Sequence, residues 1–523
     1  MRTAMTTGSP VRGRVRAAAL LTSAAFLLSC DRSITESEQL PPLVAASVDA
    51  SAGTWRMIVL TSATQVAVPA PAAITSDAYK AELAAIRTAQ ASITAEQQAK
   101  VEYWAGGGVL RWNQVLRGLV AKYNLPPAPR ADGSYVFPDA NNPFGDPAFP
   151  FANPPYAARA YSYIAVAQYE ALKAAWAYKY QYNRAAPVRN DPGVRALVPV
   201  SSLPSYPSED AVLAGVTVAM LQTLFPAAVE EATRRGADQR EAALLSGKAS
   251  SSDIAAGLAL GRSVATLVLA RMSTDGTGAA IGNATLWAAL ADSARAKGET
   301  PWLSLESPAR PPMLPVFGAV RTWNMTPAEL LAARPAKPFP TASAEMRAEV
   351  AEVKLVTSKL TREQRAIAQK WNDGAGTYTP PGHWNDIAAE LIRDASYSEV
   401  RAARALALLN MAMHDASVAC WEAKYAYFNP RPSQLDPSIR TDIGLPNFPA
   451  FPSGHSTFSA AASDVLGYLF PSEATSLRAM ADEAGMSRLY GGIHYRNDIV
   501  QGKAHGDRVA AFTLRFAQSD NAP

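Results

Sequence analysis

Apolar residues recur at spacings of three and four along most of the chain, whereas strand-like alternation with β-branched residues is scarce. The same stretches are rich in alanine, leucine and other helix formers. A spacing of three and four is typical of amphipathic and buried helices. The pattern therefore predicts an all-α protein, with long buried helices over residues 158–182 and 403–428.

The helical pattern occurs twice. Residues 158–262 and 403–507 align without a gap at a constant offset of 245. The matched pairs include Trp176 with Trp421, Lys179 with Lys424, Pro207 with Pro452, Asp253 with Asp498, and Gly257 with Gly502. A weaker match at an offset of 267 pairs Thr94, Glu96, Gln97 and Trp104 with Thr361, Glu363, Gln364 and Trp371. Self-similarity at a fixed offset indicates duplicated units, so we expect two tandem helical bundles.

Prolines separate the two copies. They cluster from Pro301 to Pro340, where they favour an extended connection over a bundle helix. We therefore expect an N-terminal bundle over residues 30–300, a proline-rich linker over 301–345 and a C-terminal bundle over 346–523.

The N-terminus has the pattern of a secretory signal. Four arginines precede an apolar run from Ala17 to Leu28, which leads into Leu27-Leu28-Ser29-Cys30. The alternative is a transmembrane anchor, but this run of about a dozen residues is shorter than the roughly 20 that a span needs. We expect residues 1–29 to be a lipoprotein signal peptide and Cys30 to carry the lipid. The mature protein would then be exported and membrane-anchored, facing the periplasm or the cell surface.

The charge balance argues against a nucleic-acid partner. The chain has 49 basic and 45 acidic residues, and residues 1–29 hold four arginines and no acidic residue. The mature chain therefore carries no formal net charge, whereas nucleic-acid binding needs a basic surface. Cys420 lies in a helical apolar pattern, so we expect it to be a core residue. Because Cys30 is the other cysteine of the chain and would carry the lipid, we expect no intramolecular disulfide in the mature protein.

Three segments of the second copy carry polar chemistry that the first copy lacks. They are Lys424-x6-Arg431-Pro432, Pro452-Ser453-Gly454-His455, and Ser487-Arg488-x5-His494-x3-Asp498. In the first copy Arg431 corresponds to Ala186, Gly454-His455 to Glu209-Asp210, Arg488 to Ala243 and His494 to Ala249. The bundle therefore does not require these residues, and their presence indicates a function.

The residue types suit an oxyanion. Lys424, Arg431 and Arg488 supply positive charge, and a guanidinium fits two oxygens of a tetrahedral anion. Ser453 and Gly454 begin a helix, where a backbone N–H approaches an anion closely. Asp498 lies one helical turn after His494 and can fix its tautomer. Each segment alone also allows a structural interpretation: solvated charges at a helix end, an ordinary N-cap, or a structural His–Asp pair.

In this order, the three segments resemble the signature of the vanadium haloperoxidase and type 2 phosphatidic acid phosphatase superfamily. The resemblance implies that oxygens of a bound anion are held by Lys424, Arg431, Ser453, the Gly454 amide and Arg488. It also implies that His494 is the apical vanadate ligand or the phosphoryl-accepting nucleophile, and that His455 is the acid/base.

Finer features favour the haloperoxidase branch. Membrane phosphatases of the superfamily have several transmembrane helices, and we find no uninterrupted apolar stretch long enough to span a membrane after residue 30. The soluble acid phosphatases have a single bundle. Trp421 and Phe448 are similar to residues that line the halide side of a fungal chloroperoxidase. The segment Trp371-Asn372-Asp373-Gly374 is similar to one whose aspartate bonds the acid/base histidine, so Asp373 is the expected partner of His455.

The leading hypothesis is therefore a vanadate-dependent haloperoxidase that oxidises halide with hydrogen peroxide. The alternative is a phosphatase that hydrolyses a phosphate ester with His494 as nucleophile and no cofactor. A structural or binding lipoprotein is the non-enzyme alternative, in which the signature would have decayed as it has in the first copy. We interpret His383, His414 and His505 as core or surface residues.

Overall fold

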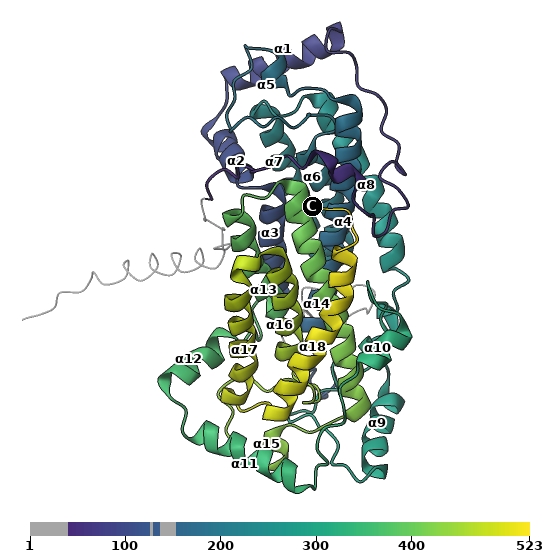
Figure 1. Ribbon diagram of the computed structural model, residues 1–523, viewed down its shortest axis with the longest axis vertical. Coiled ribbons are helices and arrows are strands. Elements are labelled where there is room, and N and C mark those ends of the chain that lie inside the picture. Colours follow the sequence, from purple (N-terminus) through teal and green to yellow (C-terminus); the bar gives the residue numbers. More distant parts are fainter. Residues whose placement is uncertain (1–39, 126–128, 136–152) are drawn as a thin grey trace, which may run out of the picture. The chain divides into compact units, whose positions relative to one another are not determined.

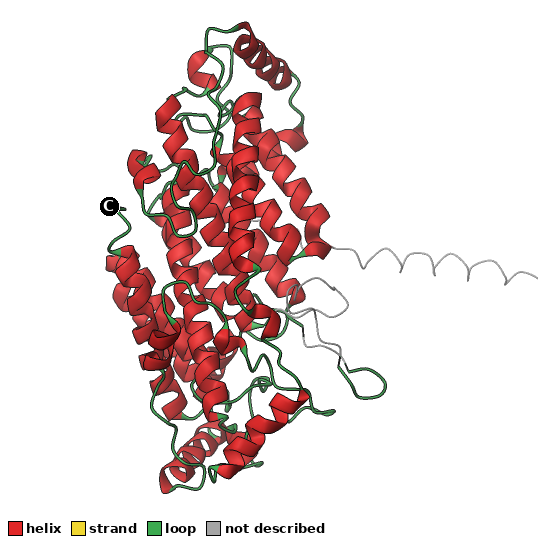
Figure 2. Cartoon of the chain, turned by 90° about the vertical axis from the view of Figure 1, so that its right-hand side faces the viewer, coloured by secondary structure: helices red, strands yellow, loops and turns green. Residues whose placement is uncertain are grey.

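The computed structural model describes residues 40–125, 129–135 and 153–523 (Figure 1). Within these ranges the chain forms helices and turns and no β-strand, apart from an isolated bridge between Pro129 and Tyr135 (Figure 2). The all-α prediction is confirmed. The signal peptide expected over residues 1–29, with Cys30, lies outside the described residues.

Residues 41–523 form a compact unit of their own. Its first-half helices are α1 (Asp77–Ala91), α2 (Ala95–Ala105), α3 (Gly108–Tyr123), α4 (Pro154–Tyr182), α5 (Pro187–Asn190), α6 (Glu209–Leu224), α7 (Val229–Leu245) and α8 (Ser251–Met272). Next come α9 (Ala284–Ala296), α10 (Pro327–Ala333) and α11 (Ala344–Ser358). The second-half helices are α12 (Arg362–Lys370), α13 (Thr379–Asp394), α14 (Glu399–Tyr427), α15 (Pro432–Leu435), α16 (Gly454–Leu469), α17 (Ala474–Tyr490) and α18 (Arg496–Ala517).

The predicted duplication is present in the helices themselves. Helices α4 to α8 recur as α14 to α18, and each pair starts and ends at residues 245 apart. The breaks between helices recur too, since Asn183 and Phe428, which follow α4 and α14, both have left-handed backbone conformations, with φ of 49° and 51°. The weaker match at offset 267 corresponds to two capping boxes, Thr94 with Gln97 at α2 and Thr361 with Gln364 at α12.

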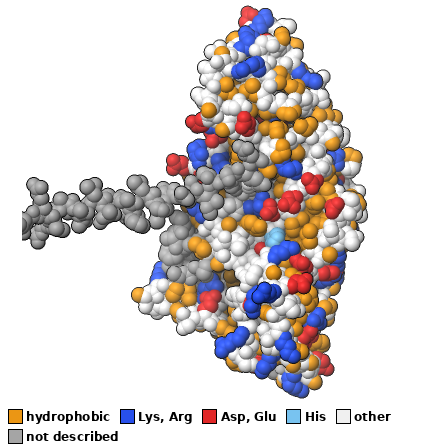
Figure 3. Space-filling view, turned by 90° about the vertical axis from the view of Figure 1, so that its left-hand side faces the viewer, with side chains coloured by type: hydrophobic (Ala, Val, Ile, Leu, Met, Phe, Trp, Pro, Cys, Tyr) orange, Lys and Arg blue, Asp and Glu red, His pale blue; other side chains and the backbone are white. Residues whose placement is uncertain are grey.

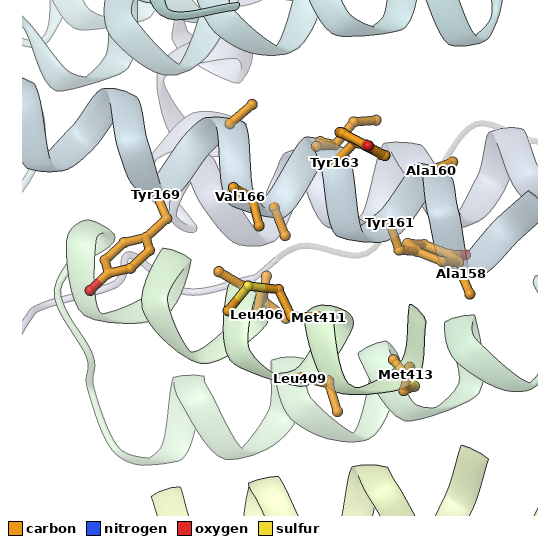
Figure 4. Packing of buried hydrophobic residues seen from close by; sticks show 14 of the residues in the cluster. Ala158, Ala160, Tyr161, Tyr163, Val166, Tyr169, Leu406, Leu409, Met411 and Met413 are labelled. Carbon is orange, nitrogen blue, oxygen red and sulfur yellow. The ribbon is translucent and has the colours of Figure 1, made fainter. Parts of the chain in front are cut away.

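The two copies share one core. Helices α4 and α14 pack against each other, and each also packs on a helix of its own copy, α6 or α16. Figure 4 shows Tyr161 and Val166 of α4 facing the part of α14 that carries Leu406 and Met411. All four side chains are fully or almost fully buried, and they belong to a single apolar cluster that spans both halves.

The proline-rich segment of residues 301–345 packs along the second copy. A Cβ at Gly318 would lie 2.5 Å from Glu422 Cα, so this segment touches the backbone of α14. Arg334 forms an ion pair with the Glu422 side chain. The segment therefore forms part of the wall around the C-terminal copy.

Paired glycines allow the closest helix crossings. A Cβ at Gly502 of α18 would lie 2.7 Å from Ser453 O, and one at Gly506 would collide with Thr457 O. Gly257 and Gly261 make the equivalent approaches of α8 to α6. By length and composition α8 is apolar enough to cross a membrane, but Arg262 interrupts its apolar run, so it is not an uninterrupted apolar stretch. The helix packs closely on α6, and 39% of its apolar window is buried.

These crossings predict a stability effect. Gly506→Ala should lower the free energy of unfolding by about 1–3 kcal/mol, because its methyl group meets main-chain atoms that cannot rotate away. Urea denaturation measures the change. Gly444→Ala is the matched control, since a Cβ there would meet nothing within 4 Å. Equal losses in the two variants would contradict the role assigned to the crossing.

Candidate functional site

The three sequence segments meet at one end of α16. Lys424 lies in the last turn of α14, Arg431 precedes α15, and Ser453 and Gly454 begin α16. Arg488 lies in the last turn of α17, and His494 follows in the turn before α18. Next to them is a cavity of about 480 Å³, whose walls include Asp373, Trp421, Phe448, Gly454, His455, Arg488 and His494.

Lys424 is buried and fastens the loop that leads into α16. Its Nζ donates to the carbonyl oxygens of Pro449 (2.9 Å), Ala450 (2.8 Å) and Pro452 (2.6 Å). Burial lowers its pKa to about 7. Lys424 is not among the residues that line the cavity, so it contributes its charge from behind the loop.

Arg431 and Arg488 are also buried and donate chiefly to main-chain oxygens. Arg431 Nε and Nη2 donate to Phe448 O at 3.1 and 2.9 Å, and its Nη1 donates to Ile493 O at 2.9 Å. Arg488 Nε donates to Ser487 Oγ at 2.8 Å, and its Nη2 donates to Trp371 O. Burial lowers the pKa of Arg431 to about 10 and that of Arg488 to about 9.

The three cations lack ion-pairing carboxylates within the described part of the chain. Arg431 instead donates to His494, and the Asp498 carboxylate bonds the far side of that ring. Charges buried without a partner are costly, and an oxyanion would relieve that cost. The cluster formed by Lys424, Arg431 and Arg488, called here the cationic cradle, is therefore an anion site by its electrostatics.

His494 is held in one tautomer. Its Nδ1 lies 2.8 Å from Asp498 Oδ2, and its Nε2 lies 2.9 Å from Arg431 Nη1. Because arginine only donates, Nε2 carries the lone pair and Nδ1 carries the proton. Burial, together with the charge of Arg431, keeps the pKa of His494 well below its usual value. The ring thus offers an unprotonated nitrogen, as a metal ligand or a nucleophile requires.

The start of α16 leaves room for an anion. A Cβ at Gly454 would touch only Phe458, 3.9 Å away, so the first turn of the helix is open on that side. Ser453 Oγ accepts the backbone N–H of Ser456 at 3.3 Å and acts as the N-cap. The helix N-terminus adds partial positive charge to the cradle.

Asp373 lies between two histidines. His455 Nε2 is 3.6 Å from Asp373 Oδ2, which brings the predicted pair together at a distance longer than a hydrogen bond. His383 Nδ1 is closer, at 3.1 and 3.3 Å from the two carboxylate oxygens. Although burial raises it, the hydrogen bond from His383 and the nearby His455 ring lower the pKa of Asp373 to about 2. Burial and Arg488 lower the pKa of His455 to about 4.

Sequence reasoning missed His383. His383 and Asp373 lie ten positions apart, and a sharp turn between α12 and α13 brings them together. Asp373 itself has a φ of 45°. This left-handed conformation is uncommon for a residue other than glycine, and the sequence does not predict it. The remaining histidines, His414 and His505, are fully buried, as expected for core residues.

Two aromatic residues wall the cavity beside the cradle. The ring centroids of Trp421 and Phe448 are 5.0 Å apart, and Trp421 Nε1 donates to Met313 O at 3.1 Å. Lys424 Nζ and the Arg431 guanidinium each lie 5.1 Å from the Phe448 ring centroid. The predicted halide-side pair therefore lies between the cations and the open space.

The first copy neutralises the equivalent position internally. Lys179 Nζ is 2.8 Å from Glu209 Oε2, and Lys248 Nζ is 2.6 Å from Asp210 Oδ2. Although burial raises it, the charges of Lys179 and Lys248 lower the pKa of Glu209 to about 2. A side-chain carboxylate thus stands at the helix start where the second copy has Gly454. In the first copy, the Glu209 carboxylate is therefore the anion that pairs with the buried lysine.

Comparison with known proteins agrees with this geometry. Residues 401–521 match the PAP2 superfamily. This PAP2 segment contains the three motifs, so the superfamily predicted from them is confirmed, while Asp373 and His383 lie before it. No curated protein sequence matches the chain.

Solved structures with a similar fold include two bacterial enzymes. A bacterial vanadium-dependent iodoperoxidase has a TM-score of 0.52 and 23% identity, over 69% of this chain and 91% of its own. The holo form of a bacterial vanadium-dependent chloroperoxidase has a TM-score of 0.51 and 12% identity, over 74% of this chain and 97% of its own. At these identities the likeness shows the fold, which extends beyond the PAP2 segment.

The cradle predicts the effect of removing one charge. Arg488→Gln should weaken binding of phosphate or vanadate by about 10- to 100-fold, because a hydrogen bond to a charged group contributes about 1.5–3 kcal/mol. Titration calorimetry measures the affinity. Arg365→Gln is the control, since that side chain is 61% exposed and pairs with Asp442 on the surface. Unchanged affinity in Arg488→Gln would remove Arg488 from the anion site.

Proposed function

We propose that this protein is a vanadate-dependent haloperoxidase that oxidises halide with hydrogen peroxide, with vanadate held at His494. The observation that carries the proposal is the neutral His494 ring, whose Nε2 lone pair faces Arg431 in the cationic cradle. The similar folds of a bacterial vanadium-dependent iodoperoxidase and a bacterial vanadium-dependent chloroperoxidase support it.

The residues present fit vanadate. Its negative charge would offset three buried cations that have no ion-pairing carboxylate among the described residues, and its oxygens match the N–H donors of Arg431, Arg488 and the Gly454 amide. His494 supplies a single nitrogen ligand, with Asp498 fixing its orientation. His455 Nε2 is buried and has no hydrogen-bond partner among the described residues, so this nitrogen is available to a bound ligand.

Each residue then has a defined task. When bound, vanadate supplies a Lewis-acid centre that activates peroxide. Arg431 and Arg488 hold negative charge, and Lys424 keeps the loop before α16 in place while adding a third charge. His455 gives and takes protons beside the anion, with Asp373 next to its ring. Trp421 and Phe448 exclude water from the halide side.

A phosphatase is the second candidate, and one observation favours it. The unprotonated Nε2 of His494 is as suitable for attack on phosphorus as for binding a metal. His455 would then protonate the leaving alcohol, and no cofactor would be needed. The cavity of about 480 Å³ has room for the organic part of an ester. A structural or binding lipoprotein is the non-enzyme candidate, and the intact cradle does not favour it.

The location is part of the proposal. The N-terminal pattern supports export, with anchoring to a membrane through a lipid on Cys30. Basic and acidic side chains are interspersed on the face shown in Figure 3, in agreement with a partner that is not a nucleic acid. The partners would be hydrogen peroxide and halide, or a phosphate ester.

The response to vanadate separates the two reactions. The chain without its signal peptide should oxidise bromide with peroxide only when vanadate is added, since vanadate is the cofactor. A phosphatase would instead hydrolyse a phosphate ester in its absence and be inhibited by it. Both assays, each with and without vanadate, test this. Hydrolysis suppressed by vanadate, without bromide oxidation, would overturn the preferred reaction.

His494→Ala should reduce bromide oxidation by about 100-fold or more and abolish binding of vanadate, because the nitrogen ligand is lost. Calorimetry should give one vanadate per chain for the wild type, since the first copy neutralises its own site. The fold should survive, because Ala249 occupies the equivalent buried position in the first copy. An unfolded variant, or two vanadate ions per wild-type chain, would contradict the assignment.

A further inference from the structure

His383 lies next to the candidate site, in contact with Asp373, and has no role in the proposed function. It lies in the first turns of α13, and its Nδ1 is within 3.3 Å of both oxygens of Asp373. Asp373 Oδ2 in turn lies 3.6 Å from His455 Nε2. The carboxylate therefore joins the acid/base histidine to a second histidine that stands outside the cationic cradle.

Packing holds the His383 ring in this orientation. The ring stacks on Trp371 with centroids 4.3 Å apart and an angle of 22° between the planes. Trp371 is itself fixed, because it is buried and its Nε1 donates to Glu483 Oε1 at 2.8 Å. The edge of Tyr378 closes another side of the ring. With its plane clamped, His383 keeps Nδ1 directed at Asp373.

Asp373 depends on this contact more than on the contact with His455. Its carboxylate side chain is only 6% exposed, and the 3.6 Å to His455 is too long for a hydrogen bond. A buried carboxylate needs a donor, and His383 supplies it. Asp373 also holds an unfavourable left-handed backbone conformation, which persists where surrounding contacts enforce it.

His383 approaches from outside the cavity. Asp373 and His455 are among the cavity's lining residues and His383 is not, yet 17% of its side chain is exposed. His383 and His455 are the two histidines in the chain that are not fully buried, and Figure 3 shows histidine at the surface of one face. A substitution at His383 therefore changes the support of the site without changing the surface that a substrate touches.

We propose that His383 is a positioning residue for the acid/base step: by donating its Nδ1 proton to Asp373, it fixes the carboxylate that orients the His455 ring. The inference rests on the proposed function, because it assigns the acid/base role to His455. His383 touches neither substrate nor anion in this arrangement. It acts through Asp373, as outer partners of metal-site and catalytic histidines do.

Two substitutions separate the hydrogen bond from the stacking. His383→Asn keeps an N–H donor near the position of Nδ1 and loses the ring on Trp371, whereas His383→Phe keeps a ring and loses the donor. With vanadate bound, His383→Phe should lower kcat for bromide oxidation by about 10- to 100-fold with little change in KM. His383→Asn should retain most of the wild-type kcat. Calorimetry should give vanadate affinities within about threefold of wild type for both, because the cradle is intact.

A second readout does not depend on turnover. With five histidines in the chain, ¹⁵N spectra of labelled rings can be assigned by single substitutions. In the full chain without vanadate, the His455 ring should show one dominant tautomer in the wild type and in His383→Asn. It should show a mixture in His383→Phe, where Asp373 has lost its donor.

The outcomes separate two kinds of failure. If His383→Phe keeps both the wild-type kcat and the His455 spectrum while His383→Asn loses stability, stacking is the whole role of His383 and the inference is wrong. If the wild type does not oxidise bromide, the proposed function fails. The His455 spectra then still decide whether His383 orients that ring.

Discussion

Three cations buried beside one another, with no carboxylate to pair with them among the described residues, are the constraint around which the second copy is built. Lys424, Arg431 and Arg488 repel one another and have lost most of their hydration. Main-chain carbonyls replace part of that hydration, at residues 448–452 for Lys424 and Arg431 and at residue 371 for Arg488. The loops that carry these carbonyls are therefore as necessary to the site as the charged side chains.

The duplication explains how such a site is tolerated. The frame of α4 to α8 and that of α14 to α18 are equivalent residue by residue, and they share one apolar core. In the first frame the buried Lys179 is paired with Glu209, whereas in the second Lys424 donates to main-chain carbonyls. The shared core supports both solutions, so polar residues at one end of the bundle diverged while the helices kept their length.

Much of this arrangement could be predicted from the sequence, because helix periodicity and a gap-free repeat fix which residues lie at equivalent places. The gathering of Arg431, Arg488 and His494 follows from that register together with the superfamily signature. The contact of His383 with Asp373 does not, since it depends on the left-handed turn at Asp373, which no periodicity encodes. Nor did the pattern show that the protons of Lys424 Nζ would be used by three carbonyls, because that depends on the path of a loop.

The ion pair between Lys179 and Glu209 has a thermodynamic consequence for the whole chain. The first copy carries a counter-ion for Lys179 in its own chain, the Glu209 carboxylate. If the second copy takes its counter-ion from solution, as in the proposed function, mass action couples its stability to the concentration of that anion. Above the dissociation constant, each tenfold rise in the concentration of free anion raises the free energy of unfolding by about 1.4 kcal/mol. Because the two copies share one core, this stabilisation extends to both.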